Sequence, residues 1–190
     1  RLVTVFRACL KARRQFIIDM YAAAVLRASG NDRLPQAEWE GVMVYLPDVQ
    51  RKAIKKARAF DVSASFKEFR VYPDGLVAAA RRSVMLFRPS MRQELERAGC
   101  LSGAHLVYSM WPGYLDNDRQ EPLRAWLERL SIPVSLCHSS GHASPADLRR
   151  LVDALSPRTV VPIHTEVPAR FVDTWENASP KMDGEWWTVG

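Results

Sequence analysis

Apolar residues recur along this chain with two different spacings, and the alternation of these spacings predicts an α/β fold. At the amino end they recur every three to four residues, which is typical of an amphipathic helix. Short continuous apolar runs follow, and such runs predict strands that are buried on both faces. The strands expected from these runs span residues 15–19, 42–46, 83–87, 105–109, 134–138 and 159–164.

Helical patterns separate the apolar runs. The expected helices span residues 2–10, 21–27, 48–60, 91–97, 120–130 and 145–155. The last has the clearest start signals, because Ser144 is a good N-cap, Pro145 suits the first helical position and Asp147 completes a capping box. Buried strands that alternate with helices favour parallel α/β layers.

Length and composition fit a globular protein. The chain has 190 residues, of which 47% are hydrophobic and 25% charged. These values exclude a disordered tail, a collagen-like fibre and a disulfide-rich miniprotein. The length predicts one domain or slightly more. Because the chain opens at Arg1 inside a helical pattern, we expect it to be a piece of a longer protein.

Charge and cysteine content indicate which binding partners and which cellular compartment to expect. The net charge of +6 favours a polyanion such as nucleic acid, or reflects solvated arginine-rich helix faces. Cys9, Cys100 and Cys137 contain no CxxC pair, so we expect neither a disulfide framework nor a zinc finger, and a cytoplasmic location. The most apolar segment, residues 16–26, is too short to cross a membrane, and no membrane partner is expected.

Histidines gather near the ends of the last two expected strands. Of the four in the chain, His138, His142 and His164 lie at such an end or just after it, where α/β sheets bind ligands. The segment 138–144 (HSSGHAS) leads directly into a helix, so it offers imidazoles, hydroxyls and unpaired backbone amides. This combination suits a phosphate, and the alternative is a capping loop that holds two histidines.

His164 is either a structural strand-end residue or a metal ligand. A catalytic zinc site needs about three protein ligands. The sequence contains neither HxHxDH nor HExxH. Most of any metal site would therefore lie outside this chain.

Several segments resemble one family. HSSGHAS, a helix and a strand ending in PIHTE resemble the carboxy-terminal motifs of metallo-β-lactamase-fold nucleases with a β-CASP insertion, the ribonuclease J and cleavage/polyadenylation endonuclease group. YSMWPGYL (108–115) resembles the strand and turn before the first of these motifs, and RQFIIDMYAAAVL (14–26) resembles the start of the insertion. The likeness is strongest over residues 104–166 and weak over 31–75.

The resemblance implies a fold and two domains. It implies a parallel-rich, three-layer, Rossmann-like β-CASP domain over residues 1–131. The carboxy-terminal strand-helix-strand part of a metallo-β-lactamase fold, an RNA-metabolising segment, would follow over residues 132–190.

The resemblance also implies roles for individual residues. His142 matches the catalytic histidine that contacts the scissile phosphate or assists the leaving group, and His164 matches a zinc ligand. The other metal-binding motifs of the family precede the insertion and are absent here, so two zinc ions are expected in the intact parent, with most ligands outside this chain. The residues that match the phosphate-binding loop are His138, Ser139, Ser140, Gly141, His142 and Ser144.

The expected function is therefore part of a zinc-dependent hydrolase that cleaves phosphodiester bonds, in RNA first and DNA second. Expected partners are RNA, a missing amino-terminal lactamase-fold portion and a second copy of the chain. Two alternatives stay open. One is a lactamase-fold hydrolase of a small molecule, with the insertion as a lid. The other is a non-catalytic module that binds nucleic acid or phosphate.

Three further features carry two interpretations each. Asp19 ends a strand, and we favour a structural or rim role over that of an active-site acid. Trp111 and Tyr114 flank a Pro-Gly pair, so a packed turn is favoured over stacking on a base. The basic helix over 48–60 is a solvated face or tracks an RNA backbone.

Overall fold

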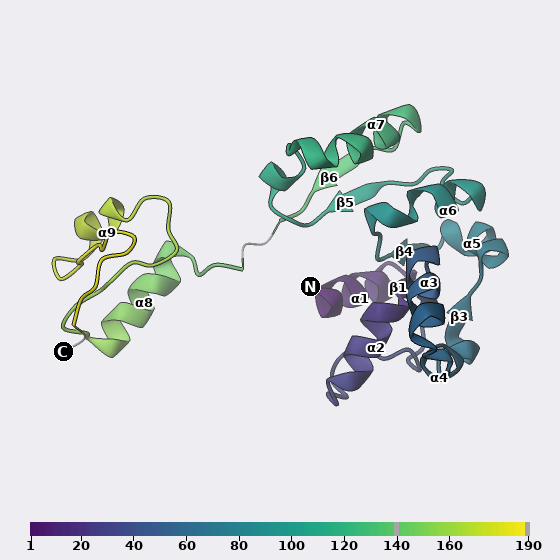
Figure 1. Cartoon of the computed structure of the whole chain (residues 1–190), viewed down its shortest axis with the longest axis horizontal. Helices are drawn as coiled ribbons and strands as arrows, with labels where there is room; N and C mark the ends of the chain where they lie inside the picture. The colour runs from purple at the N-terminus through teal and green to yellow at the C-terminus, as the bar shows by residue number, and fades with distance from the viewer. Residues whose placement is uncertain (139–140, 189–190) are drawn as a thin grey trace. The chain divides into compact units, whose positions relative to one another are not determined.

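The computed structural model describes residues 1–138 and 141–188 and has an α/β fold with parallel strands (Figure 1). Contacts divide the chain into two compact units, Arg1–His138 (unit 1) and Ser139–Gly190 (unit 2). The expectation of an α/β fold with parallel strands is therefore confirmed.

The main sheet of unit 1 has four parallel strands, β1 (Gln15–Asp19), β2 (Val42–Tyr45), β3 (Arg70–Val71) and β4 (Ser83–Met85). Their order is β3-β2-β1-β4, the order of the first four strands of a Rossmann-type sheet. In the register of the sheet, Phe16 lies between Val42 and Val84. The expected strands at 15–19, 42–46 and 83–87 are confirmed, whereas the two-residue β3 was not expected.

Helices cover both faces of this sheet. Successive residues of β1 point to opposite sides, and each side packs against different helices. Phe16 and Ile18 belong to one apolar cluster, which includes residues of the first two helices. Ile17 belongs to a second cluster with Leu76 and Leu95 from two later helices. The sheet therefore lies between two helical layers. The helices of unit 1 are α1 (Leu2–Lys11), α2 (Met20–Ala28), α3 (Asp48–Ala57), α4 (Phe60–Ala64), α5 (Pro73–Ala80), α6 (Arg92–Arg97) and α7 (Glu121–Arg129).

One expected helix is shorter than predicted. The pattern over 48–60 predicts a single helix, but α3 ends at Ala57 because Arg58 adopts a left-handed conformation with φ of 55°. A separate short helix, α4, follows. The structure also contains α5, which the sequence pattern does not predict.

A second, two-stranded sheet completes unit 1. β5 (Leu106–Tyr108) and β6 (Val134–Leu136) pair in parallel, and α7 connects them. Trp126 and Leu127 of α7 form the buried cluster against which Leu106 packs. Because β6 pairs with β5, the compact units divide after His138, while the domain boundary expected at 131/132 stays a prediction.

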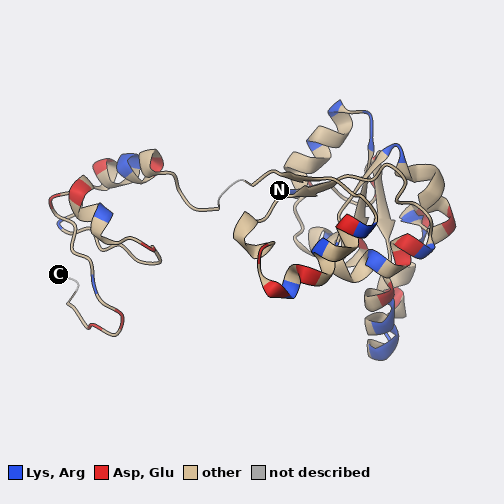
Figure 2. Cartoon of the chain, turned by 90° about the horizontal axis from the view of Figure 1, so that it is seen from above, with Lys and Arg blue, Asp and Glu red and all other residues tan. Residues whose placement is uncertain are grey.

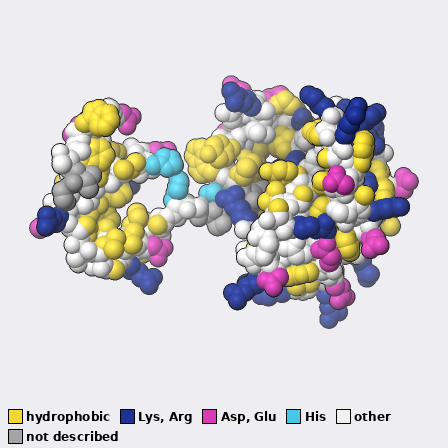
Figure 3. All heavy atoms as spheres, turned by 60° about the horizontal axis from the view of Figure 1, so that its bottom comes forward, with side chains coloured by type: hydrophobic (Ala, Val, Ile, Leu, Met, Phe, Trp, Pro, Cys, Tyr) yellow, Lys and Arg dark blue, Asp and Glu magenta, His cyan; other side chains and the backbone are white. Residues whose placement is uncertain are grey.

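Unit 2 contains α8 (Pro145–Leu155) and α9 (Ala169–Thr174). The strand expected over 159–164 is wrong, because the structure has only an isolated bridge between Val160 and Ala178. Pro162 provides no backbone N–H for a ladder, and no named strand lies in the described part of unit 2. None of residues 141–188 is buried, and Figure 3 shows many hydrophobic side chains on the surface.

Candidate functional site

The structure brings two of the predicted site residues together. The ring centroids of His142 and His164 lie 5.5 Å apart, with an angle of 81° between the ring planes. Both residues are exposed, and Figure 3 shows histidine side chains on the surface. Residues 22 positions apart in the sequence therefore form one pair in unit 2.

Local structure positions each member of this pair. His142 precedes α8, whose N-cap is Ser144; the Ser144 hydroxyl accepts a hydrogen bond from the Asp147 amide at 3.2 Å and donates one to the Asp147 carboxylate at 2.7 Å. The expected N-cap at Ser144 is thus confirmed, whereas the Asp147 carboxylate accepts from the Ser144 hydroxyl and not from its backbone amide as a capping box requires. His164 has a left-handed backbone with φ of 58°, which non-glycine residues adopt rarely. The chain therefore turns at His164, where the sequence predicts the end of a strand.

The phosphate-binding loop stays a prediction. Ser139 and Ser140 lie outside the described residues. Gly141 is exposed, and a Cβ there would meet nothing within 4 Å, so there is open space at this position. Asp147 already places a carboxylate in the first turn of α8, where it takes the Ser144 hydrogen. A phosphate at this helix start would have to compete with that carboxylate.

His138 belongs to unit 1. It follows β6, is exposed, and its Nδ1 lies 3.2 Å from the Ser109 carbonyl oxygen. Since the carbonyl only accepts, Nδ1 is the donor, which leaves Nε2 available to a ligand. The structure therefore places His138 at a strand end, as expected, but in a different unit from the pair of His142 and His164.

The residues present fit part of a zinc site. The neutral imidazole of His164 is a ligand type that zinc accepts, and the ring of His142 lies beside it with a centroid distance of 5.5 Å. Within residues 1–138 and 141–188, no three His, Cys, Asp or Glu side chains are grouped so that they could hold a metal ion. Since a catalytic zinc needs about three protein ligands, the described residues do not complete the site.

A second polar cluster lies at the end of β1. The buried Asp19 carboxylate accepts hydrogen bonds from the Ala22 amide at 2.7 Å and from Gln50 Nε2 at 2.9 Å, and it pairs with Arg88 Nε. The hydrogen bond to Asp19 raises the pKa of Arg88. The structural role that we favoured for Asp19 agrees with these contacts. Sequence reasoning missed Arg88, although a charged residue directly after an apolar strand is a usable signal.

The turn at Trp111 and Tyr114 is packed, as expected. The two rings meet edge to face with centroids 5.4 Å apart. The Trp111 ring lies directly over Gly113, so any Cβ there would overlap it. The rings thus hold each other across the turn, and both remain more than half exposed.

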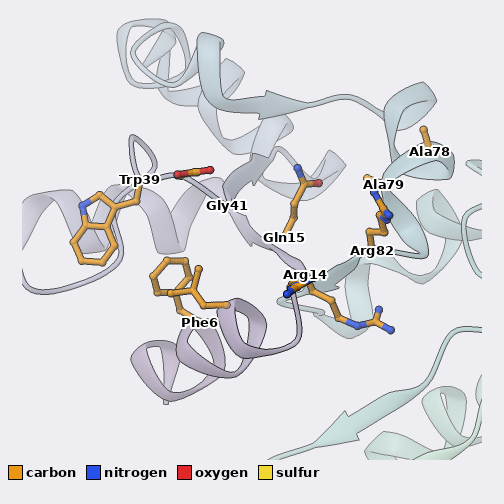
Figure 4. Close-up of a pocket in the computed structure, with 11 residues that line it drawn as sticks. Phe6, Arg14, Gln15, Trp39, Gly41, Ala78, Ala79 and Arg82 are labelled. Carbon is orange, nitrogen blue, oxygen red and sulfur yellow. The ribbon is translucent and has the colours of Figure 1, made fainter.

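An open pocket of about 890 Å³ lies at the amino ends of β1 and β2 (Figure 4). Phe6 and Trp39 line one part of it, and Arg14 and Arg82 another. None of the predicted site residues lines it. Parallel α/β sheets bind ligands at the opposite, carboxyl edge, so we do not assign this pocket a function.

Positive charge gathers on α3, which is one of the helices with several Lys and Arg residues in Figure 2. Its sequence, DVQRKAIKKA, holds four basic residues, and none of its residues is buried. The basic helix face expected from the sequence is therefore present and accessible. No helix in the described ranges is both long and apolar enough to cross a membrane.

Comparison with known families gives one match. Residues 121–170 match the family described as Zn-dependent metallo-hydrolase RNA specificity domain. No curated protein and no solved structure matches the chain. The matched segment includes α7, β6 and α8, together with both members of the histidine pair. This match supports a relation to zinc-dependent metallo-hydrolases that act on RNA.

Proposed function

We propose that this chain is part of a zinc-dependent metallo-hydrolase of the β-CASP group, which cleaves phosphodiester bonds in RNA. One observation carries the proposal: His142 and His164 meet at 5.5 Å inside the segment that matches the RNA specificity domain. In this proposal residues 1–131 form the β-CASP domain and residues 132–190 the carboxy-terminal part of the lactamase fold.

The two histidines have different roles in the proposal. His164 is a zinc ligand through its neutral imidazole, and zinc, when bound, would supply a Lewis acid for a phosphoryl oxygen. His142 is the catalytic residue that donates a proton or a hydrogen bond to the scissile phosphate or the leaving oxygen. The short distance between the two ring centroids, 5.5 Å, supports this division of roles, because a phosphate bound by His142 would lie near a zinc ion bound by His164.

The loop before α8 would bind the substrate phosphate. We propose that His138, Ser139, Ser140, Gly141 and Ser144 line it together with His142. Backbone amides at the start of an eleven-residue helix favour an anion. For Ser144 to donate to a phosphate, its hydroxyl must leave Asp147, so we expect binding to rotate this side chain.

An amino-terminal lactamase-fold portion would complete the site. We propose that this portion supplies the remaining zinc ligands, for two zinc ions in all. The exposed apolar side chains of unit 2 support this, because a surface of this kind needs a partner. The 190-residue chain alone should therefore show no RNA turnover with zinc or manganese.

The test uses the complete protein that contains this sequence and three histidine variants. H164A should lower both zinc content and rate, because it removes a ligand. H142A should reduce single-turnover cleavage of a labelled RNA by roughly 10²- to 10³-fold and keep the zinc, since it removes one donor to the transition state. H105A is the control, because His105 bonds Ser135 in unit 1, outside the proposed site. Elemental analysis and single-turnover rates are measured on each variant.

Two results would contradict the proposal. If H142A loses the zinc and H164A keeps it, the two roles are reversed. If both variants cleave RNA as fast as H105A, the histidine pair is not part of an active site. H164N adds a backbone control, because asparagine tolerates the left-handed conformation of His164 but lacks the imidazole.

A further inference from the structure

The carboxyl edge of the main sheet holds a pair of side chains that the proposed function does not use. β1 pairs with β2 on one side and with β4 on the other. The chain moves outward from β1 through β2 to β3 and then returns to β4, so the strand order reverses between β1 and β4. Open α/β sheets bind ligands at the carboxyl edge of such a reversal. Tyr21 and Arg88 follow β1 and β4 at this edge.

Arg88 is held in a fixed orientation. Its Nε donates to Asp19, whose side chain is fully buried and also accepts bonds from Ala22 and Gln50. Nη1 and Nη2 of Arg88 have no hydrogen-bond partner among the described residues, and the side chain is 43% exposed. Because only Nε is bonded to Asp19, Nη1 and Nη2 are available to a ligand.

This guanidinium lies over one face of an exposed aromatic ring and leaves the other face for a stacked base. Arg88 Cζ is 5.7 Å from the centroid of the Tyr21 ring, and Tyr21 is 63% exposed. Gln50 connects the two residues. Its Oε1 accepts a hydrogen bond from the Tyr21 amide at 3.0 Å, and its Nε2 donates to Asp19, the partner of Arg88. The backbone at Tyr21 and the side chain of Arg88 are thus fixed by the same glutamine and carboxylate.

We infer that Arg88 and Tyr21 form a binding site for one nucleotide of a single-stranded RNA. The planar guanidinium suits a phosphate oxygen pair, and the phenol ring offers a face on which an unpaired base can stack. Gln50 lies on α3, the helix with four basic residues, which would attract the adjoining phosphates. The choice of RNA as ligand rests on the proposed function.

Binding by the 190-residue chain tests this inference. A fluorescein-labelled single-stranded RNA of 12 nucleotides is titrated with protein, and fluorescence anisotropy is followed in the presence of a chelator. R88Q should weaken binding about tenfold and lower the salt dependence by about 0.7 in log–log slope, the value for one phosphate contact. R33Q is the control, because it removes the same charge from an exposed arginine whose side chain has no ion pair in the described structure. R88K should weaken RNA binding as much as R88Q does, because the lysine ammonium cannot donate to Asp19 and to a phosphate in the geometry of a planar guanidinium.

Tyrosine variants test the stacking half of the site. Y21L should weaken binding about tenfold, within the range measured for removing one base–aromatic stack, whereas Y21F should bind as the unmodified chain does. Equal effects of R88Q and R33Q, or no effect of Y21L, would overturn the inference. Two further results would overturn it. One is duplex RNA that binds as tightly as single-stranded RNA, and the other is inorganic phosphate that displaces the labelled RNA as effectively, per phosphate group, as unlabelled RNA does.

A measurement on the unmodified chain covers the case in which R88Q fails to fold. RNA that contains 4-thiouridine is cross-linked by light, and the protein is digested with trypsin. The cross-link should fall in the tryptic peptide 15–27, which contains Tyr21, and a cross-link confined to other peptides would overturn the site. No zinc or cleavage enters these assays. Binding without nuclease activity in the complete protein would contradict the proposed function alone, and cleavage without the Arg88 effect would contradict this inference alone.

Discussion

Unit 1 and unit 2 contain similar amphipathic helices, but only unit 1 buries their apolar faces. In the described part of the chain, every buried apolar residue lies between Phe6 and Ile132. In unit 2, Leu155 is 67% and Ile163 75% exposed. The helix α8 forms with a good N-cap, yet none of its residues is buried in the described structure. Local signals are thus sufficient for a helix, whereas a core needs two layers.

Amide hydrogen exchange gives the largest expected difference between the units. The amides of β1 are buried in the sheet and should open only with global unfolding, whereas those of α8 should open locally. We expect exchange at least about 10³-fold faster in α8 than in β1. Mass spectrometry of the exchanging 190-residue chain measures both. Equal protection of α8 and β1 would show that unit 2 has a core of its own.

A matched pair of isoleucine substitutions sharpens the comparison. Ile18 is fully buried in β1, so I18A should lower the free energy of unfolding by about 2–5 kcal/mol. I163A removes the same atoms from an exposed position and should change it by less than about 0.5 kcal/mol. Urea unfolding followed by circular dichroism measures both. A cost for I163A similar to that of I18A would mean that Ile163 is buried in solution.

Alkaline pH should act on unit 1 through Tyr45. Burial, together with the nearby Glu94 carboxylate, raises the pKa of the Tyr45 hydroxyl above its ordinary value. Above about pH 10 the unfolded chain loses this proton while the folded chain keeps it. The free energy of unfolding should therefore fall by up to about 1.4 kcal/mol per pH unit from this group.

Urea unfolding between pH 8 and pH 11 checks this dependence. Y45F should have a flatter decline than the unmodified chain, and Y72F, at an exposed tyrosine, serves as the control. Parallel declines of Y45F and the unmodified chain would show that another group is responsible.

The smallest expected effect concerns the cap of α8. S144A removes the hydroxyl that bonds the Asp147 amide and should destabilise the helix by about 0.5–1 kcal/mol. S144N should retain most of this stability, because asparagine also caps helices well. Exchange of the α8 amides measures the change. If S144A leaves them unaffected, packing and not the cap holds the helix.

The sequence pattern predicts unit 1 better than unit 2, for a physical reason. Strands such as residues 15–19 and 42–46 are continuous apolar runs that the fold buries on both faces, so their pattern is strong. The two-residue β3 is too short to have a pattern. The run at 159–164 has the composition of a strand, but Pro162 lies inside it, and among the described residues it makes only a single bridge.

The sequence likewise predicts only part of the candidate sites. The sequence predicts that His142 and His164 lie near the ends of two successive strands; the structure brings their rings together, but His164 lies in a left-handed turn and not at a strand end. The pair of Asp19 and Arg88 could not be paired from sequence, since 69 positions separate the two residues and only the β1–β4 register brings them together. Contacts of this kind belong to the topology and not to any local segment.

The strand order of unit 1 also has a consequence during synthesis on the ribosome. β1 occupies an interior position, yet its partner β4 begins 68 residues later in the chain. At about 5–20 residues per second, β4 follows β1 by roughly 3–14 s. Throughout that interval one edge of β1 offers unpaired backbone groups and apolar side chains. The growing chain is therefore most prone to aggregate at this edge, before β4 has been made.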